Sequence, residues 1–183
     1  MSTRSVGKPP LFLHLQHATA SPTIGTLAPV SMNYHTIVDQ LAVGPYPADP
    51  AQVMALKRNG ITAILNVQSD ADFRDRAIQW NLFWKFYVSR GIHVVRCPIT
   101  DFDSSDLSAK LPGAIEALQT LLVAKHSVYL HCTAGVNRSP TVAIGWLMTH
   151  GGYDMAGAVE HFLTVRKVAV PDLHALRRLA SSI

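Results

Sequence analysis

The stretch Ser127-Val-Tyr-Leu-His-Cys-Thr-Ala-Gly-Val-Asn-Arg-Ser-Pro-Thr141 carries the strongest structural signal in this chain. Its first five residues form a short apolar run, which is typical of a buried strand. The apolar run from Thr141 to Thr149 predicts a buried helix. Gly135, in the middle of the segment between them, permits a close backbone approach or a positive φ. The stretch therefore predicts a strand, a tight turn over Cys132 to Arg138, and a helix.

The same alternation of strands and helices extends outward from this stretch. Further strands are predicted over 37–43, 61–67 and 93–99, and helices over 50–58, 72–90, from about Pro112, 155–166 and 172–180. Pro98 predicts that the strand 93–99 lies at a sheet edge or strand end. This order predicts a single α/β domain with a central, mostly parallel sheet flanked by helices. Loops at the carboxyl ends of such strands bind ligands, and the turn after His131 is one of them.

The length of 183 residues suits one domain, and the N-terminal part differs in composition from the rest. Residues 1–31 contain four prolines, Arg4 and Lys8, and no acidic residue. Such a segment is typical of an arm on the domain or of a transit segment. We therefore expect an N-terminal extension over 1–31 and a catalytic domain over 32–183. The location is then cytoplasmic, or plastid if residues 1–31 are a transit segment, and intracellular in either case.

Charge and cysteine content narrow the function classes. The net charge is +4, but the basic residues are scattered, so we expect neither nucleic acid nor a membrane as partner. No apolar run approaches the ~20 residues of a membrane span. Two cysteines, Cys97 and Cys132, favour a reducing compartment over a disulfide scaffold. No two of the nine histidines have metal-ligand spacing. We expect a monomer without metal or cofactor.

The turn after His131 has the features of an anion site. Five successive N–H groups can point inward, and the helix adds its positive end. The predicted phosphate-binding residues are Thr133, Ala134, Gly135, Val136 and Asn137. Arg138 can hold two phosphate oxygens, which lysine cannot. The helix end and the guanidinium favour the thiolate form of Cys132, a nucleophile.

Two further side chains fit this chemistry, and one alternative stands against it. Ser139 can donate a hydrogen bond to the sulfur of Cys132, and His131 can orient the loop. The alternative is an inert buried cysteine before an ordinary turn. A His-Cys pair, a central Gly and an Arg-Ser pair at fixed offsets favour catalysis over that alternative.

The pattern His131-Cys132-x5-Arg138-Ser139 resembles the signature of the dual-specificity phosphatase family, and the resemblance extends from about Asn33 to Arg178. It implies a phosphomonoesterase with a phosphocysteine intermediate and an aspartate that acts as general acid and then base. The family places this acid about thirty residues before the cysteine, which indicates Asp101, with Asp103 as the alternative. Asp106 is then a helix cap or a solvated residue. Cys97 is a redox partner of Cys132 or a core residue.

The substrate class stays open between phosphoproteins and phosphoglucans. The loop lacks the extra basic residues of lipid phosphatases, and the short domain suits phosphotyrosine, phosphoserine and phosphothreonine. The segments Asp101-Phe-Asp-x-x-Asp-Leu107 and Ala63 to Phe73 resemble plant glucan (starch) phosphatases, in which Phe102 would stack on a sugar ring. The aromatic residues Trp80, Phe83, Trp84 and Tyr87 form either a further platform or the core. Asn137, where glucan phosphatases favour glycine, and Ser139-Pro140 are closer to protein-directed enzymes. An inactive phosphate-binding pseudophosphatase is the alternative from another class.

Overall fold

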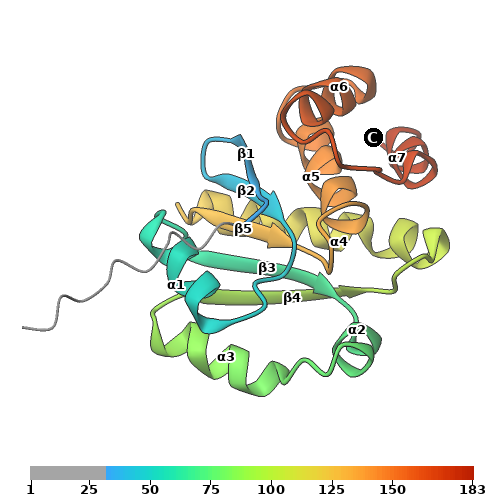
Figure 1. The fold of residues 1–183 in the computed structure, drawn as a ribbon. Helices are drawn as coiled ribbons and strands as arrows, with labels where there is room; N and C mark the ends of the chain where they lie inside the picture. Colours follow the sequence, from blue (N-terminus) through green and yellow to red (C-terminus); the bar gives the residue numbers. More distant parts are fainter. Residues whose placement is uncertain (1–31) are drawn as a thin grey trace, which may run out of the picture.

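Residues 32–183, which the computed structural model describes, form a central sheet with helices on both faces (Figure 1). The strands are β1 (His35–Val38), β2 (Leu41–Gly44), β3 (Ala63–Gln68), β4 (His93–Ile99) and β5 (Val128–His131). They lie in the order β1-β2-β5-β3-β4, and only β1 runs antiparallel to its neighbour. The predicted fold class is confirmed. The predicted extension over 1–31 lies outside the described residues.

Helices cover the two faces of the sheet unequally. They are α1 (Pro50–Arg58), α2 (Asp70–Asp75), α3 (Trp80–Ser89), α4 (Ser104–Val123), α5 (Arg138–Thr149), α6 (Met155–Val165) and α7 (Leu173–Ala180). Helices α4 to α7 pack on one face, and α1 and α3 on the other (Figure 1). Side chains alternate along each strand. Leu130 therefore faces α4 to α7, whereas Tyr129 faces α1 and α3.

Two predicted elements are corrected by the structure. The predicted strand 37–43 is a hairpin, because Gln40 adopts a positive φ of 67° and turns the chain between β1 and β2. The helix expected from about Pro112 begins at Ser104. The Asp103 side chain caps it by accepting a hydrogen bond from the Asp106 N–H, so the helix starts early and includes Pro112 in its interior. β4 with Pro98 lies at the sheet edge, as predicted.

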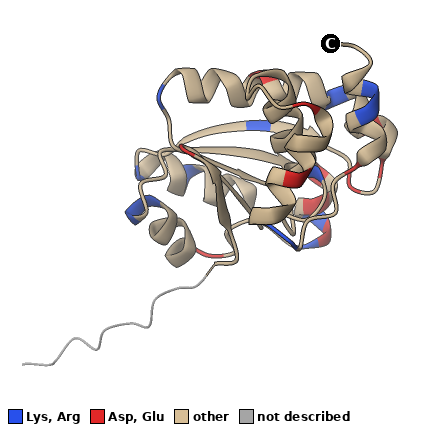
Figure 2. Ribbon diagram, turned by 90° about the horizontal axis from the view of Figure 1, so that it is seen from above, with Lys and Arg blue, Asp and Glu red and all other residues tan. Residues whose placement is uncertain are grey.

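The surface charge of residues 32–183 is distributed rather than concentrated. Figure 2 shows Lys and Arg on several elements, interspersed with Asp and Glu. Within the same residues, none of the helices is both long and apolar enough to cross a membrane.

Candidate active site

The predicted phosphate loop joins the carboxyl end of β5 to the first turn of α5. Gly135, in the middle of this loop, has a φ of +66°. A side chain at this position would collide with the backbone of Gly44 and Pro45. Only glycine can adopt this conformation so close to another backbone segment, and the loop therefore packs directly against the end of β2.

Cys132, the predicted nucleophile, lies at the end of β5 and is almost completely buried. The Ser139 hydroxyl donates a hydrogen bond to its sulfur over 3.3 Å. Ser139 lies in the first turn of α5 and is itself buried. The sulfur thus lies beside a fixed donor and close to the N-terminus of α5.

Arg138, the predicted phosphate clamp, is held by a network of oxygen atoms. Its Nη1 donates to the backbone oxygen of Ile99 at 2.9 Å and to Asp72 Oδ2 at 2.8 Å. Its Nη2 donates to Asp72 Oδ1 at 2.9 Å and to the Thr133 hydroxyl oxygen at 3.3 Å. The ends of β4 and α2 therefore fix the plane of the guanidinium.

Asp72 also lies in the site, although no role was predicted for it. Burial alone would raise its pKa, but hydrogen bonds from Arg138, Thr133 and Ser69 outweigh that effect and hold the pKa far below its usual range. The same carboxylate accepts hydrogen bonds from the N–H and hydroxyl of Ser69 and completes the capping box of α2. The spacing Ser69-x-x-Asp72 directly after a buried strand is typical of a capping box, and it is the sequence feature that could have identified this residue.

Thr133 connects this carboxylate to β3. Its hydroxyl donates to Asp72 Oδ1 at 2.5 Å and accepts from Gln68 Nε2 at 3.1 Å. Gln68 is the last residue of β3 and is buried. Thr133, predicted as a phosphate-binding residue, therefore also supports Asp72.

The two candidate acids have different environments. The carboxylate of Asp101 forms an ion pair with Arg138 Nη2 at 2.9 Å and is about one third exposed. The carboxylate of Asp103 caps α4, away from the guanidinium network. Asp106 pairs with Lys110 and accepts from the Thr100 N–H, so it is not the helix cap. Of these three carboxylates, Asp101 is the one that contacts the Arg138 guanidinium.

His131 is fully buried behind the loop. Burial lowers its pKa to about 4, so the ring is neutral at neutral pH. Its Nδ1 lies 3.1 Å from the Cys132 carbonyl oxygen. An oxygen of this kind can only accept, so Nδ1 carries the proton. This contact with the Cys132 carbonyl is the one through which His131 would orient the loop.

Phe102 is fully exposed and has a positive φ of 58°. It lies between two shallow pockets at the edge of the site. One pocket also contains Asp72, Asp101 and Arg76, and the other contains Val136 and Asn137 of the loop. The ring is therefore accessible from both pockets.

Arg166 also contacts the loop, although no role was predicted for it. Its Nε donates to the Gly135 oxygen at 2.9 Å, and its Nη1 donates to the Asn33 oxygen at 2.9 Å. The side chain is buried, and burial lowers its pKa. No spacing rule connects this residue at the end of α6 with the loop, because only the tertiary fold brings them together.

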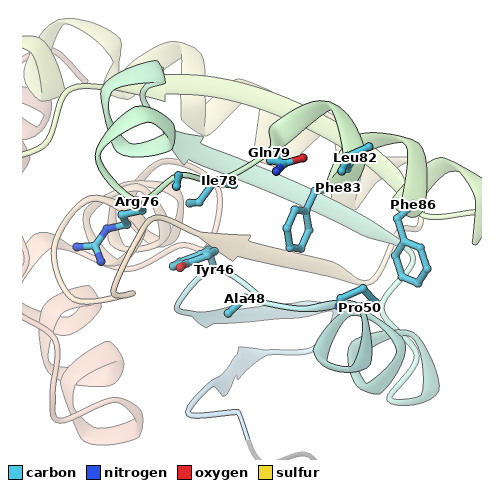
Figure 3. A pocket seen from close by; sticks show the side chains of 10 residues that line it. Tyr46, Ala48, Pro50, Arg76, Ile78, Gln79, Leu82, Phe83 and Phe86 are labelled. Atoms are coloured by element: carbon cyan, nitrogen blue, oxygen red, sulfur yellow. The ribbon is translucent and has the colours of Figure 1, made fainter.

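An apolar pocket of about 500 Å³ lies between α3 and the segment after β2 (Figure 3). Phe83 and Phe86 of α3 and Tyr46 line it. Arg76 lines both this pocket and the pocket that contains Asp101. The other predicted platform residues lie elsewhere. Trp80 stacks on Phe73 with 5.1 Å between ring centroids, Tyr87 is buried, and Trp84 is half-exposed outside the pocket.

Cys97 is half-buried on β4, and burial raises its pKa. β3 separates this strand from β5. Two strand spacings amount to roughly 9–10 Å, beyond the Cα separation of a disulfide. Cys97 therefore packs against the core, and a bond to Cys132 is out of reach.

Curated proteins from several organisms are similar to this chain in sequence. Phosphoglucan phosphatase DSP4, amyloplastic, from Castanea sativa is 28% identical over 156 residues, covering 84% of this chain and 41% of its own length. Dual specificity protein phosphatase Mpk3 from Drosophila melanogaster is 33% identical over 127 residues, covering 69% and 28%. The chain thus spans less than half the length of these curated relatives.

The fold also matches a solved structure. The active form of Tk-PTP aligns with a TM-score of 0.70 and 23% identity, over 82% of this chain and 97% of that one. Residues 45–182 match the family described as dual specificity phosphatase, catalytic domain. They contain the whole loop from Cys132 to Arg138, together with Asp72 and Asp101. This chain belongs to the dual specificity phosphatase family.

Proposed function

We propose that this chain hydrolyses phosphate monoesters in two steps through a phosphocysteine intermediate. The observation that carries the proposal is the meeting of four groups at one edge of the sheet. The Cys132 sulfur accepts a hydrogen bond from the Ser139 hydroxyl, and the Arg138 guanidinium beside the loop pairs with the Asp101 carboxylate. A nucleophile, an anion clamp and a proton donor are the parts that such a transfer needs.

In the first step, the Cys132 thiolate attacks phosphorus, so that a P–S bond forms and the ester P–O bond breaks. Arg138 and the loop N–H groups hold the non-bridging oxygens and stabilise their charge. Asp101 in its protonated form gives its proton to the departing ester oxygen.

In the second step, water attacks the phosphocysteine and the P–S bond breaks. The Asp101 carboxylate accepts the proton of this water, which restores the acid for the next cycle. The Ser139 hydroxyl stabilises the sulfur as it leaves as a thiolate, over the 3.3 Å contact described above. His131 holds the Cys132 carbonyl throughout.

Hydrolysis of p-nitrophenyl phosphate tests the nucleophile, and the chain provides a matched control. Cys132→Ser is expected to abolish turnover, whereas Cys97→Ser, at the only other thiol, is expected to retain it. Wild-type turnover in Cys132→Ser would refute the proposal. If the wild-type chain binds tungstate but releases no phosphate, the pseudophosphatase alternative is correct.

The substrate is a phosphorylated protein or a phosphoglucan, and one observation favours the glucan. Phe102 is fully exposed beside Asp101, and a fully exposed aromatic ring is suited to stacking on a sugar. The DSP4 relative is named a phosphoglucan phosphatase, whereas the Mpk3 relative is named a protein phosphatase. Asn137 and Pro140 keep the protein alternative open.

Parallel phosphate release from amylopectin, a phosphotyrosine peptide and a phosphothreonine peptide distinguishes the two. A phosphoglucan enzyme is expected to prefer amylopectin by about tenfold or more, the size of one aromatic contact. Phe102→Ala should then remove that preference while leaving p-nitrophenyl phosphate turnover within about twofold. Equal or faster release from the peptides would establish a protein phosphatase.

We also propose a reducing intracellular compartment, because a reactive thiolate is prone to oxidation elsewhere. The location is plastid if residues 1–31 direct import, and cytoplasmic if they do not. Fusion of residues 1–31 to a fluorescent protein tests this choice, with a fusion that lacks them as control. Plastid fluorescence with the segment alone would establish the transit function, and diffuse fluorescence would refute it.

A further inference from the structure

Asn66 and His131 lie side by side behind the catalytic loop. They are register partners on the neighbouring strands β3 and β5, so their side chains project from the same face of the sheet. That face packs against α1 and α3, opposite to the face that holds Cys132. Both side chains are completely buried. An amide and an imidazole therefore lie on the same buried face of the sheet, among aromatic and aliphatic side chains and the amide of Gln68.

Each of these side chains has one polar atom without a partner among residues 32–183. On His131 it is Nε2, and on Asn66 it is Nδ2. His131 Nδ1 donates to the Cys132 oxygen, so its Nε2 is a bare acceptor. Asn66 Oδ1 accepts from the Gln68 N–H at 2.7 Å, which identifies the other amide atom as the NH₂ donor. One unpaired donor and one unpaired acceptor thus lie next to each other.

The two side chains line the same small cavity. Its volume is about 10 Å³, close to the space that one water molecule requires. Tyr46, Ile78 and Phe83 line both this cavity and the larger pocket in Figure 3, so the cavity lies directly behind a pocket that opens to solvent. Buried polar atoms without partners are costly, and an internal water that bridges them removes that cost.

We propose that one water molecule binds in this cavity, accepting a hydrogen bond from Asn66 Nδ2 and donating one to His131 Nε2. The water fixes the tautomer of His131 that has its proton on Nδ1. That proton in turn holds the Cys132 carbonyl at the start of the loop. Asn66 is therefore a positioning residue that acts on the nucleophile through a water and an imidazole. The effect on turnover rests on the proposed phosphatase function, but the water site does not.

A high-resolution crystal structure and NMR of the histidine nitrogens test the site directly. We expect one ordered water within hydrogen-bond distance of Asn66 Nδ2 and His131 Nε2, and a protonated Nδ1 with an unprotonated Nε2. A dry cavity, a direct Asn66–His131 bond, or a proton on Nε2 would overturn the proposal. These readouts do not require turnover, so they remain decisive if the chain proves to be inactive.

Substitutions of Asn66 test the connection to the loop. Asn66→Leu is expected to mix the two tautomers of His131 and to lower kcat about fivefold, the size of one hydrogen bond, with little change in KM. Asn66→Ser keeps a donor and leaves room for a second water, so it should retain the single tautomer. Ile64→Val alters packing on the same strand face without a polar change and should leave the tautomer alone. If Asn66→Leu does not fold, a mixed tautomer in Asn66→Ser refutes the proposal.

Discussion

Arg138 and Asp72 form a buried ion pair with two contacts, Nη1 to Oδ2 at 2.8 Å and Nη2 to Oδ1 at 2.9 Å. Their side chains are 1% and 6% exposed. A carboxylate that binds both amino groups fixes the orientation of the guanidinium as well as its charge. The capping box of α2 thus determines where the phosphate clamp lies.

Asp72→Ala is expected to destabilise the fold by about 3 kcal/mol, because it leaves a buried guanidinium without its main partner. The loss of orientation should also lower kcat/KM by about tenfold or more. Chemical denaturation and steady-state kinetics measure the two effects. Asp75→Ala removes an exposed carboxylate from the same helix and serves as the control. Equal losses in both variants would show that Asp72 has no special role.

Asp101→Asn is expected to slow hydrolysis by a factor that depends on the leaving group. Phenyl phosphate needs a proton on its departing oxygen, so its kcat should fall by about 10²-fold, whereas p-nitrophenyl phosphate should be affected much less. Rates for a series of aryl phosphates measure this dependence. Asp103→Asn is a matched control, because asparagine caps a helix as well as aspartate does. The same dependence in Asp103→Asn would transfer the acid role to that residue.

Ser139→Ala is expected to slow the second step selectively. Without the hydroxyl at 3.3 Å from the sulfur, the thiolate is a poorer leaving group, so kcat should fall about tenfold while kcat/KM changes little. Rapid-quench kinetics should show a burst of one product per enzyme. An equal fall in kcat and kcat/KM would place the role of Ser139 in the first step instead.

His131 is expected to make stability depend on pH. Its folded pKa of about 4 lies below the value of about 6.5 in an unfolded chain. The unfolded state therefore binds the proton more readily, and the free energy of unfolding should fall by up to about 3 kcal/mol as the pH drops from about 6.5 to about 4. Denaturation at a series of pH values measures this loss. His131→Gln should not lose stability over this pH range, whereas His93→Gln, at an exposed histidine, should lose as much as the wild type. If both variants lose stability, other titrating groups are responsible.

The sequence predicted the parts of the site that are local. Cys132, Arg138 and Ser139 lie within one strand–turn–helix unit, and the structure brings them together as expected. Asp72 and Arg166 contact the loop from 66 and 31 residues away, as the Arg138 and Gly135 contacts show. Such contacts depend on strand order, which periodicity does not reveal. The start of the helix at Ser104 was predicted too late, because proline is typical of a first helical turn and Pro112 was taken as that start. The Asp103 cap lies nine residues before Pro112.

Both amino groups of Arg138 contact the Asp72 carboxylate, and Nη2 also contacts the Asp101 carboxylate. An oxyanion that enters the loop therefore competes with Asp101 for the same donor, and its apparent affinity falls by the free energy of breaking that contact. Asp101→Asn should bind inorganic phosphate several-fold more tightly in calorimetry, even though it turns over more slowly; weaker binding would contradict this. If Asp101 competes in this way, we expect its returning carboxylate to displace the product in the wild-type chain and so to promote phosphate release.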